Sequence, residues 1–152
     1  MSISDLGSLG EFVASFGVLI TLIFLTFQMR QNTKAVRASI ASDMTSHWLS
    51  NSNVMASSSD LFQIMARANE TGSMEAEGAG RYYFWVVNVL KIVEFAHYQR
   101  NEGTLDEQLW ETNVAGLRSL MDGTIFEEIW TSQRNLYTAD FRGFVDALLT
   151  ER

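Results

Sequence analysis

Four side chains in this sequence have the types and the spacing to bind a metal ion. Glu94 and His97 form a Glu-x-x-His pair, while Asp43 and His47 lie four residues apart. On a helix both spacings place the two side chains on one face, and Glu-x-x-His is the pair that di-iron bundles offer to their metals. The sequence contains one such pair where a di-iron bundle needs two, and Lys91 offers Glu94 an ion pair instead. A metal or ligand site at these four residues is kept as an alternative, and no cofactor is expected.

Familiar catalytic motifs are missing from the sequence. It has no cysteine, no Gly-rich phosphate loop, no G-x-S-x-G and no HExxH. These are the signatures of thiol enzymes, nucleotide enzymes, serine hydrolases and zinc proteases. We therefore expect a non-enzymatic protein without catalytic residues. The numerous aromatic side chains could line an apolar ligand cavity, but large aromatics more often pack in a core.

The elements that carry these residues are predicted to be helices. The chain has 152 residues and no proline, and helix formers such as Ala, Leu, Met, Glu and Gln are plentiful, which favours an all-α fold. We expect residues 1–29 to form an N-terminal flank and a transmembrane helix. This helix should continue without a break to about residue 50, as the first helix of a cytoplasmic bundle formed by residues 30–152.

The other helices of the bundle can be placed by their capping signals and their apolar spacing. They are predicted over 60–69, 81–103, 105–121, 124–136 and 139–149, with 70–80 as a loop or a poorly ordered helix start. Gly103 should end one helix, Thr104 and Glu107 should form a capping box for the next, and Thr138 should cap the last. Residues 82–98 carry four polar side chains, including Asn88, and such groups are expensive at membrane depth. This segment is therefore predicted to be a core helix and not a second span.

An apolar run near the N-terminus is predicted to cross a membrane. Residues 6–29 are mainly apolar, and Glu11 is the one ionisable side chain among them. As a helix they extend for about 36 Å, which exceeds the hydrocarbon core of about 30 Å. A signal peptide would begin with basic residues, but the start here is acidic. A core helix that is apolar on every face would need more surrounding helices than so small a domain provides.

The charges beside this run predict its orientation. All eleven Lys and Arg residues lie at or after Arg30, although the whole chain has a net charge of −7. Arg30, Lys34 and Arg37 follow the apolar run directly, share one helical face, and can reach anionic lipid headgroups. Basic flanks stay on the cytoplasmic side, so we expect the N-terminus outside and the bundle inside. An acidic body with a single basic cluster does not favour nucleic acid as a partner.

One face of the long helix carries small or polar residues at steps of three and four, interrupted in its first half by Phe24. Small residues let two spans approach closely in a bilayer, and a spacing of 3.5 residues favours left-handed pairing. The predicted pairing seam consists of Gly7, Gly10, Ala14, Gly17, Thr21, Gln28, Gln31, Ala35 and Ala38. Since one span is predicted, its partner would be a second copy or another membrane protein. Glycines are also common in spans that do not pair.

Three stretches of the sequence carry a resemblance to known proteins. EFVASFGVLITLIFLTFQMRQNTKAVRAS, VEFAHYQRNEGTLDEQLW and IWTSQRNLYTADFRGFVDALL resemble a widespread group of small bacterial single-span membrane proteins. That group shares Gln-x-Arg-Gln-Asn-Thr after the span and Phe-Arg-x-Phe-Val-Asp near the end. The likeness departs mainly over residues 49–81 and at Ala139, where members often carry proline. It implies the same topology and no activity, and it marks Glu94, Gln99, Gly103, Trp110, Phe141, Arg142 and Asp146.

These observations lead to one principal expectation about function and two alternatives. The principal expectation is a non-enzymatic protein of the bacterial inner membrane. It would act through helix pairing in the bilayer and a cytoplasmic bundle, as a homo-oligomer or an accessory subunit. The first alternative is a membrane-tethered ligand or metal sensor. The second is an oligomeric pore lined by Thr21, Gln28 and Gln31.

Overall fold

The computed structural model describes residues 3–71 and 76–151, and within these residues it contains helices and no strand. The elements are α1 (Ile3–Ser57), α2 (Ser59–Thr71), α3 (Ala76–Asn101), α4 (Glu107–Met121), α5 (Phe126–Gln133), the short 3-10 helix η1 (Arg134–Leu136) and α6 (Ala139–Thr150). The expected all-α fold, with a long N-terminal helix that joins a helical bundle, is confirmed. Two compact units divide the chain, Met1–Ala38 and Ser39–Arg152, and α1 contributes residues to both.

The first unit is the N-terminal part of α1. Its three threonine side chains bond back to the helix. Thr21 Oγ1 donates to the Gly17 carbonyl at 2.9 Å, and Thr26 and Thr33 make the equivalent bond one turn back. Such bonds let Ser and Thr sit in an apolar helix, because the hydroxyl is satisfied without water.

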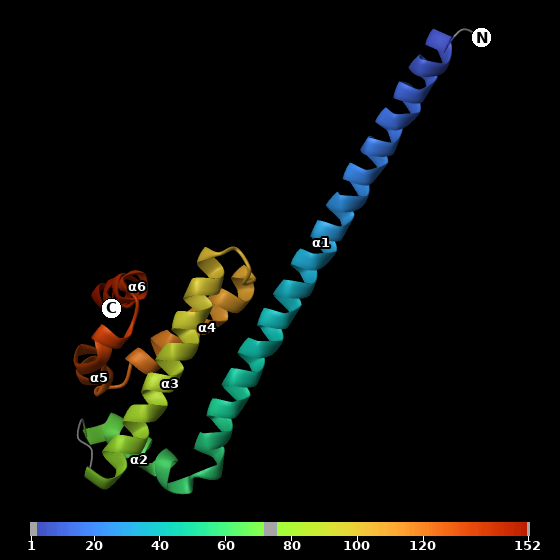
Figure 1. Cartoon of the computed structure of the whole chain (residues 1–152). Helices are drawn as coiled ribbons and strands as arrows, with labels where there is room; N and C mark the ends of the chain where they lie inside the picture. Colours follow the sequence, from blue (N-terminus) through green and yellow to red (C-terminus); the bar gives the residue numbers. More distant parts are fainter. Residues whose placement is uncertain (1–2, 72–75, 152) are drawn as a thin grey trace. The chain divides into compact units, whose positions relative to one another are not determined.

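The second unit is built around α3, against which α2, α4 and α5 all pack (Figure 1). Leu90, Val93 and Ala96 of α3 are completely buried, as are Phe141 and Val145 of α6. The spacing of three within α3 keeps these side chains on one face of that helix. The prediction that residues 82–98 form a core helix of the bundle is therefore confirmed.

The C-terminal part of α1 belongs to this second unit. Ile40 and Met44 are buried in its core, and Trp48 Nε1 donates to the buried Asn113 Oδ1 of α4 at 2.8 Å. The helix continues to Ser57, beyond the predicted end near residue 50. Packing explains the difference, since Asn51 is buried and Met55 packs against the core. Tertiary contacts have here overridden the low helix propensity of a Ser/Asn-rich stretch.

The start of α3 decides between two alternatives. Residues 70–80 were expected to form a loop or a poorly ordered start to the next helix; residues 76–80 form the first turns of α3, and residues 72–75 lie outside the described part of the chain. Gly78 is buried where α2 and α3 meet, and a Cβ at this position would lie 2.7 Å from Ile64 Cδ1 and Cγ1. A glycine of low helix propensity is thus retained because α2 approaches this turn closely.

Two predictions concern the connection between α3 and α4, and one of them is confirmed. Gly103 adopts a φ of +69° and its N–H bonds to the Arg100 carbonyl, as expected for a glycine that ends a helix. The predicted capping box of Thr104 and Glu107 is wrong. Asp106 caps α4 through the Gln108 N–H, while the Thr104 hydroxyl bonds back to Gln99 in α3.

Candidate functional site

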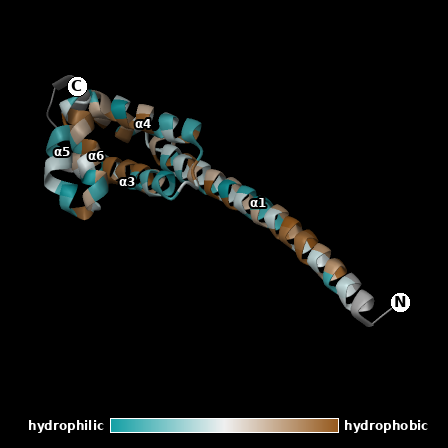
Figure 2. Cartoon of the chain, turned by 90° about the horizontal axis from the view of Figure 1, so that it is seen from above, coloured by the Kyte–Doolittle hydropathy of each residue, from teal (hydrophilic) through white to brown (hydrophobic). Residues whose placement is uncertain are grey.

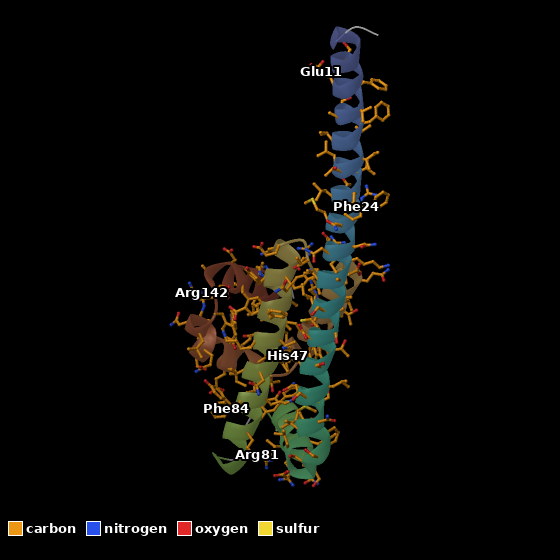
Figure 3. The ribbon with its side chains drawn as sticks, turned by 45° about the vertical axis from the view of Figure 1, so that its right-hand side comes forward. Glu11, Phe24, His47, Arg81, Phe84 and Arg142 are labelled. Carbon is orange, nitrogen blue, oxygen red and sulfur yellow. The ribbon has the colours of Figure 1, made fainter. Side chains whose placement is uncertain are left out.

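The most distinctive surface of the chain is the apolar part of α1 in the first unit. Large side chains from Phe12 to Phe27 are each about half exposed or more, and Phe24, for example, is 59% exposed. Figure 2 colours this stretch as hydrophobic, and Figure 3 shows the side chains of Glu11 and Phe24 projecting from the ribbon. Within the described residues, one helix is long and apolar enough to cross a membrane, and none of its most apolar window is buried. A folded chain in water rarely leaves so large a contiguous apolar surface uncovered.

The predicted pairing seam lies on this helix and is exposed along its whole length. A Cβ added at Gly7, Gly10 or Gly17 would find no described heavy atom within 4 Å outside the helix itself. The small residues therefore serve no packing purpose among the residues that the structure describes. The polar members of the seam, Gln28 and Gln31, are likewise exposed.

The three basic residues after the apolar stretch form a shallow groove on the same helix. Arg30, Lys34 and Arg37 line it together with Thr26, Met29 and Thr33, and its volume is about 450 Å³. No acidic residue occurs between Glu11 and Asp43 in the sequence. This segment is therefore locally cationic although the chain as a whole is acidic.

Glu94 accepts hydrogen bonds through both of its carboxylate oxygens. Its Oε1 accepts the Thr138 N–H at 2.7 Å, and its Oε2 accepts Lys91 Nζ at 2.7 Å. Lys91 Nζ also donates to the Leu136 carbonyl at 2.8 Å and lies 4.3 Å from the centre of the Tyr137 ring. The two side chains of α3 thus hold the turn between η1 and α6, and the predicted Lys91 ion pair is present.

These contacts decide the protonation of Glu94. Burial by itself would raise the pKa of this carboxyl group. The hydrogen bonds from Lys91 and Thr138, together with the Lys91 charge, outweigh burial and lower the pKa. Thr138 stands at the N-cap position of α6 as predicted, but its side chain makes no capping bond. Glu94 binds the backbone there instead, so this carboxylate has an architectural role at neutral pH.

His97 lies in an aromatic cluster. Its ring centre is 5.1 Å from that of Phe144, 5.6 Å from that of Trp110 and 5.8 Å from that of Phe141. Burial lowers the pKa of its imidazole, and the Arg100 charge acts in the same direction, while Asp140 and Glu94 oppose them. The surroundings therefore favour the neutral imidazole.

The structure does not gather the four candidate metal ligands into one site. Asp43 and His47 are exposed on α1, where the His47 ring meets Phe95 edge-on at 6.4 Å. Glu94 is occupied by Lys91 and Thr138, and His97 by rings. Among the described residues there is no group of three or more His, Asp or Glu side chains placed to hold a metal ion.

The residues marked by the resemblance hold the turns and the core of the second unit. Gln99 accepts the Thr104 hydroxyl at 2.6 Å, beside the turn at Gly103. Asp146 accepts Trp130 Nε1 at 2.8 Å and also binds Arg134, which ties α6 to α5 and η1. The remaining marked aromatics, Trp110 and Phe141, are buried. Sequence reasoning had no signal for these partners, because each contact joins separate elements.

No family model, curated protein or solved structure matches this chain.

Proposed function

We propose that this chain is a membrane-anchored assembly protein of the bacterial inner membrane, in which α1 spans the bilayer and pairs with another span. The observation that carries the proposal is the wholly exposed apolar stretch of α1. Complete transfer of a Leu, Ile, Val or Phe side chain from water to an apolar environment gains about 1.5–3 kcal/mol, and each side chain here, about half exposed or more, gains a part of this. A stretch with more than ten such side chains therefore favours a bilayer strongly over water.

The proposed orientation and lipid contacts rest on charge. The cations Arg30, Lys34 and Arg37 lie at one end of the apolar stretch. At the other end, the ionisable side chains are all acidic. This asymmetry supports a cytoplasmic second unit and an N-terminus outside. The shallow groove that the three cations line would then lie at the inner membrane surface, where it would contact anionic headgroups.

The exposed seam supports a function in assembly more than it supports a function in catalysis. The glycines of the seam are exposed, and nothing described in this chain packs against them. In lipid, close backbone approach along such residues is a main source of attraction between helices. A second copy of this chain is the simplest partner, and a different single-span protein is the other one.

Topology can be tested directly because the natural sequence has no cysteine. Ser2→Cys and Thr150→Cys each introduce one reactive thiol, and intact cells are treated with a membrane-impermeant maleimide. We expect labelling at position 2 in intact cells and labelling at position 150 only after lysis. The opposite pattern would reverse the proposed orientation, and recovery of the protein in the soluble fraction would reject the anchor.

Assembly can be tested by native mass spectrometry of the chain released from mild detergent. The double variant Gly10→Leu/Gly17→Leu widens the seam, whereas Ser15→Leu/Thr26→Leu changes two residues on the far side of the same helix. We expect the natural protein to form a defined oligomer. Gly10→Leu/Gly17→Leu should weaken its association at least tenfold, and Ser15→Leu/Thr26→Leu should leave the oligomer intact. A strict monomer without a captured partner, or equal effects of the two pairs, would reject pairing along this seam.

A further inference from the structure

A groove in the second unit combines apolar walls with side chains that can form hydrogen bonds. It lies between the C-terminal part of α1 and the middle of α3, and Figure 3 labels His47 at this place. Its volume is about 400 Å³, which falls in the range of small-molecule sites. Its lining residues are His47, Ser50, Asn51 and Val54 from α1 and Asn88, Lys91, Ile92 and Phe95 from α3.

Asn51 is the unusual member of this lining. It is only 7% exposed, and within the described part of the chain its carboxamide is not among the buried side-chain groups that lack a partner, so its polar atoms keep some contact with solvent at the groove. The other buried polar residue, Asn113, bonds both to Trp48 and to the Leu109 carbonyl. The Asn51 amide lies at the wall of the groove, where a ligand can complete its bonds.

The lining also defines the charge of a suitable ligand. Among the residues that the structure describes, no carboxylate lines the groove, so these residues offer no carboxylate partner to a cationic ligand. The Lys91 ammonium is already bound by Glu94 Oε2 and by the Leu136 carbonyl, so it does not offer an uncompensated charge to an anion. A neutral ligand therefore matches this surface best.

The shape and the polar groups narrow the ligand further. Phe95 is 36% exposed at the groove, and Ile92 and Val54 extend this apolar surface, which suits the face of a planar ring. A carboxamide presents a donor and an acceptor side by side. Asn side chains use this pair to bind bases that carry an adjacent donor and acceptor, as in the edge of adenine.

We propose that this groove binds a small, neutral, planar heteroaromatic molecule, with Asn51 and Asn88 bonded to an adjacent donor and acceptor on its edge and Phe95 against its ring. The class includes free nucleobases and related lactams or amino-heterocycles. The site is independent of the membrane proposal, since every residue that forms it belongs to the second unit.

The test uses the full chain in mild detergent with carbon-13 labelled histidine, and adenine as the probe. The sequence has two histidines; His47 lines the groove, and His97 in its aromatic cluster is an internal control. We expect adenine to shift the NMR signal of His47 in a saturable way, with a dissociation constant of about 1 mM. The NMR signal of His97 should not shift. Purine, which lacks the amino donor of adenine, is expected to bind at least tenfold more weakly.

The variants separate the Asn51 contact from general effects. Asn51→Leu is expected to weaken adenine binding at least tenfold. Asn53→Leu is a change of the same type on the exposed face of α1, and it is expected to leave adenine binding unchanged. Asn88→Leu, at an exposed position of α3, is expected to weaken adenine binding as well. Three results would overturn the proposal: no shift of His47 with adenine, equal shifts of both histidines, or unchanged binding in Asn51→Leu and Asn88→Leu.

Discussion

Glu94 of α3 accepts a hydrogen bond from the backbone N–H of Thr138, 44 residues later, at 2.7 Å. The start of α6 is therefore fixed by a side chain from another helix and not by its own N-cap hydroxyl. A carboxylate at a helix N-terminus is also favoured by the helix dipole. This contact and the Lys91 ion pair explain why a half-buried acid is stable in the bundle.

Glu94→Ala is expected to destabilise the second unit by about 2 kcal/mol, because it removes charge-assisted hydrogen bonds to Thr138 and Lys91. Glu94→Gln keeps an acceptor for the Thr138 N–H and should lose about half as much. Thermal unfolding of the full chain in mild detergent, followed by near-UV circular dichroism, measures both. Glu111→Ala on the exposed face of α4 is the control and should change the midpoint little. Equal stability of all three variants would show that the Glu94 contacts contribute nothing.

The lowered pKa of Glu94 predicts an acid-dependent loss of stability. Because the folded-state pKa lies below the ordinary value of 4.5, the unfolded chain binds more protons between the two values. The contribution of Glu94 is therefore complete above about pH 4.5 and is lost as the pH falls through the folded-state pKa. Unfolding midpoints measured from pH 6 downward should decline less in Glu94→Gln than in the natural protein. Parallel curves would contradict this assignment.

His97 predicts a second pH dependence at higher pH. Burial lowers the pKa of its imidazole below the ordinary 6.5, so the unfolded chain takes up a proton first as the pH falls. Stability should therefore be constant above about pH 6.5 and should fall as the pH drops from there toward the folded-state pKa. His97→Phe keeps a ring beside Trp110 and Phe144 and should flatten the curve in that range. His47→Phe, at an exposed position, controls for the loss of one imidazole.

Gly103→Ala is expected to cost about 1 kcal/mol, because the φ of +69° at this turn is unfavourable for a residue with a Cβ. Gly143→Ala is the matched control, since Gly143 lies inside α6 and a Cβ there meets nothing within 4 Å. That second change should be neutral or stabilising by up to about 1 kcal/mol. Thermal midpoints of the two variants should therefore move in different directions, and a shared direction would refute the argument from φ.

Gly78→Ala and Gly80→Ala form another matched pair, two residues apart on α3. An added Cβ at Gly78 would lie 2.7 Å from Ile64, so α2 or Ile64 must shift, and a cost of about 1–3 kcal/mol is expected. At Gly80 the space is open, and the higher helix propensity of Ala should stabilise by up to about 1 kcal/mol. Denaturation of both variants under identical conditions measures the difference. If Gly78→Ala is the more stable of the two, α2 does not pack closely on this turn.

The sequence by itself determined the features that depend on neighbouring residues in the chain. A proline-free composition and the apolar run at residues 12–27 predicted an all-α fold and a long first helix, and the polar side chains of residues 82–98 predicted a core helix there. Gly103 was correctly assigned to a helix end because its conformational freedom is a property of the residue itself. The Lys91–Glu94 pair was found for the same reason, since it lies within one helix.

Only the tertiary structure decided the features that depend on contacts between helices. The extension of α1 to Ser57 and the Glu94 bond to Thr138 each have this origin. Local patterns cannot reveal them, because the free energy that selects each one comes from a partner distant in sequence. The same holds for Asn51, which looks like an ordinary polar residue until α3 buries it beside a groove.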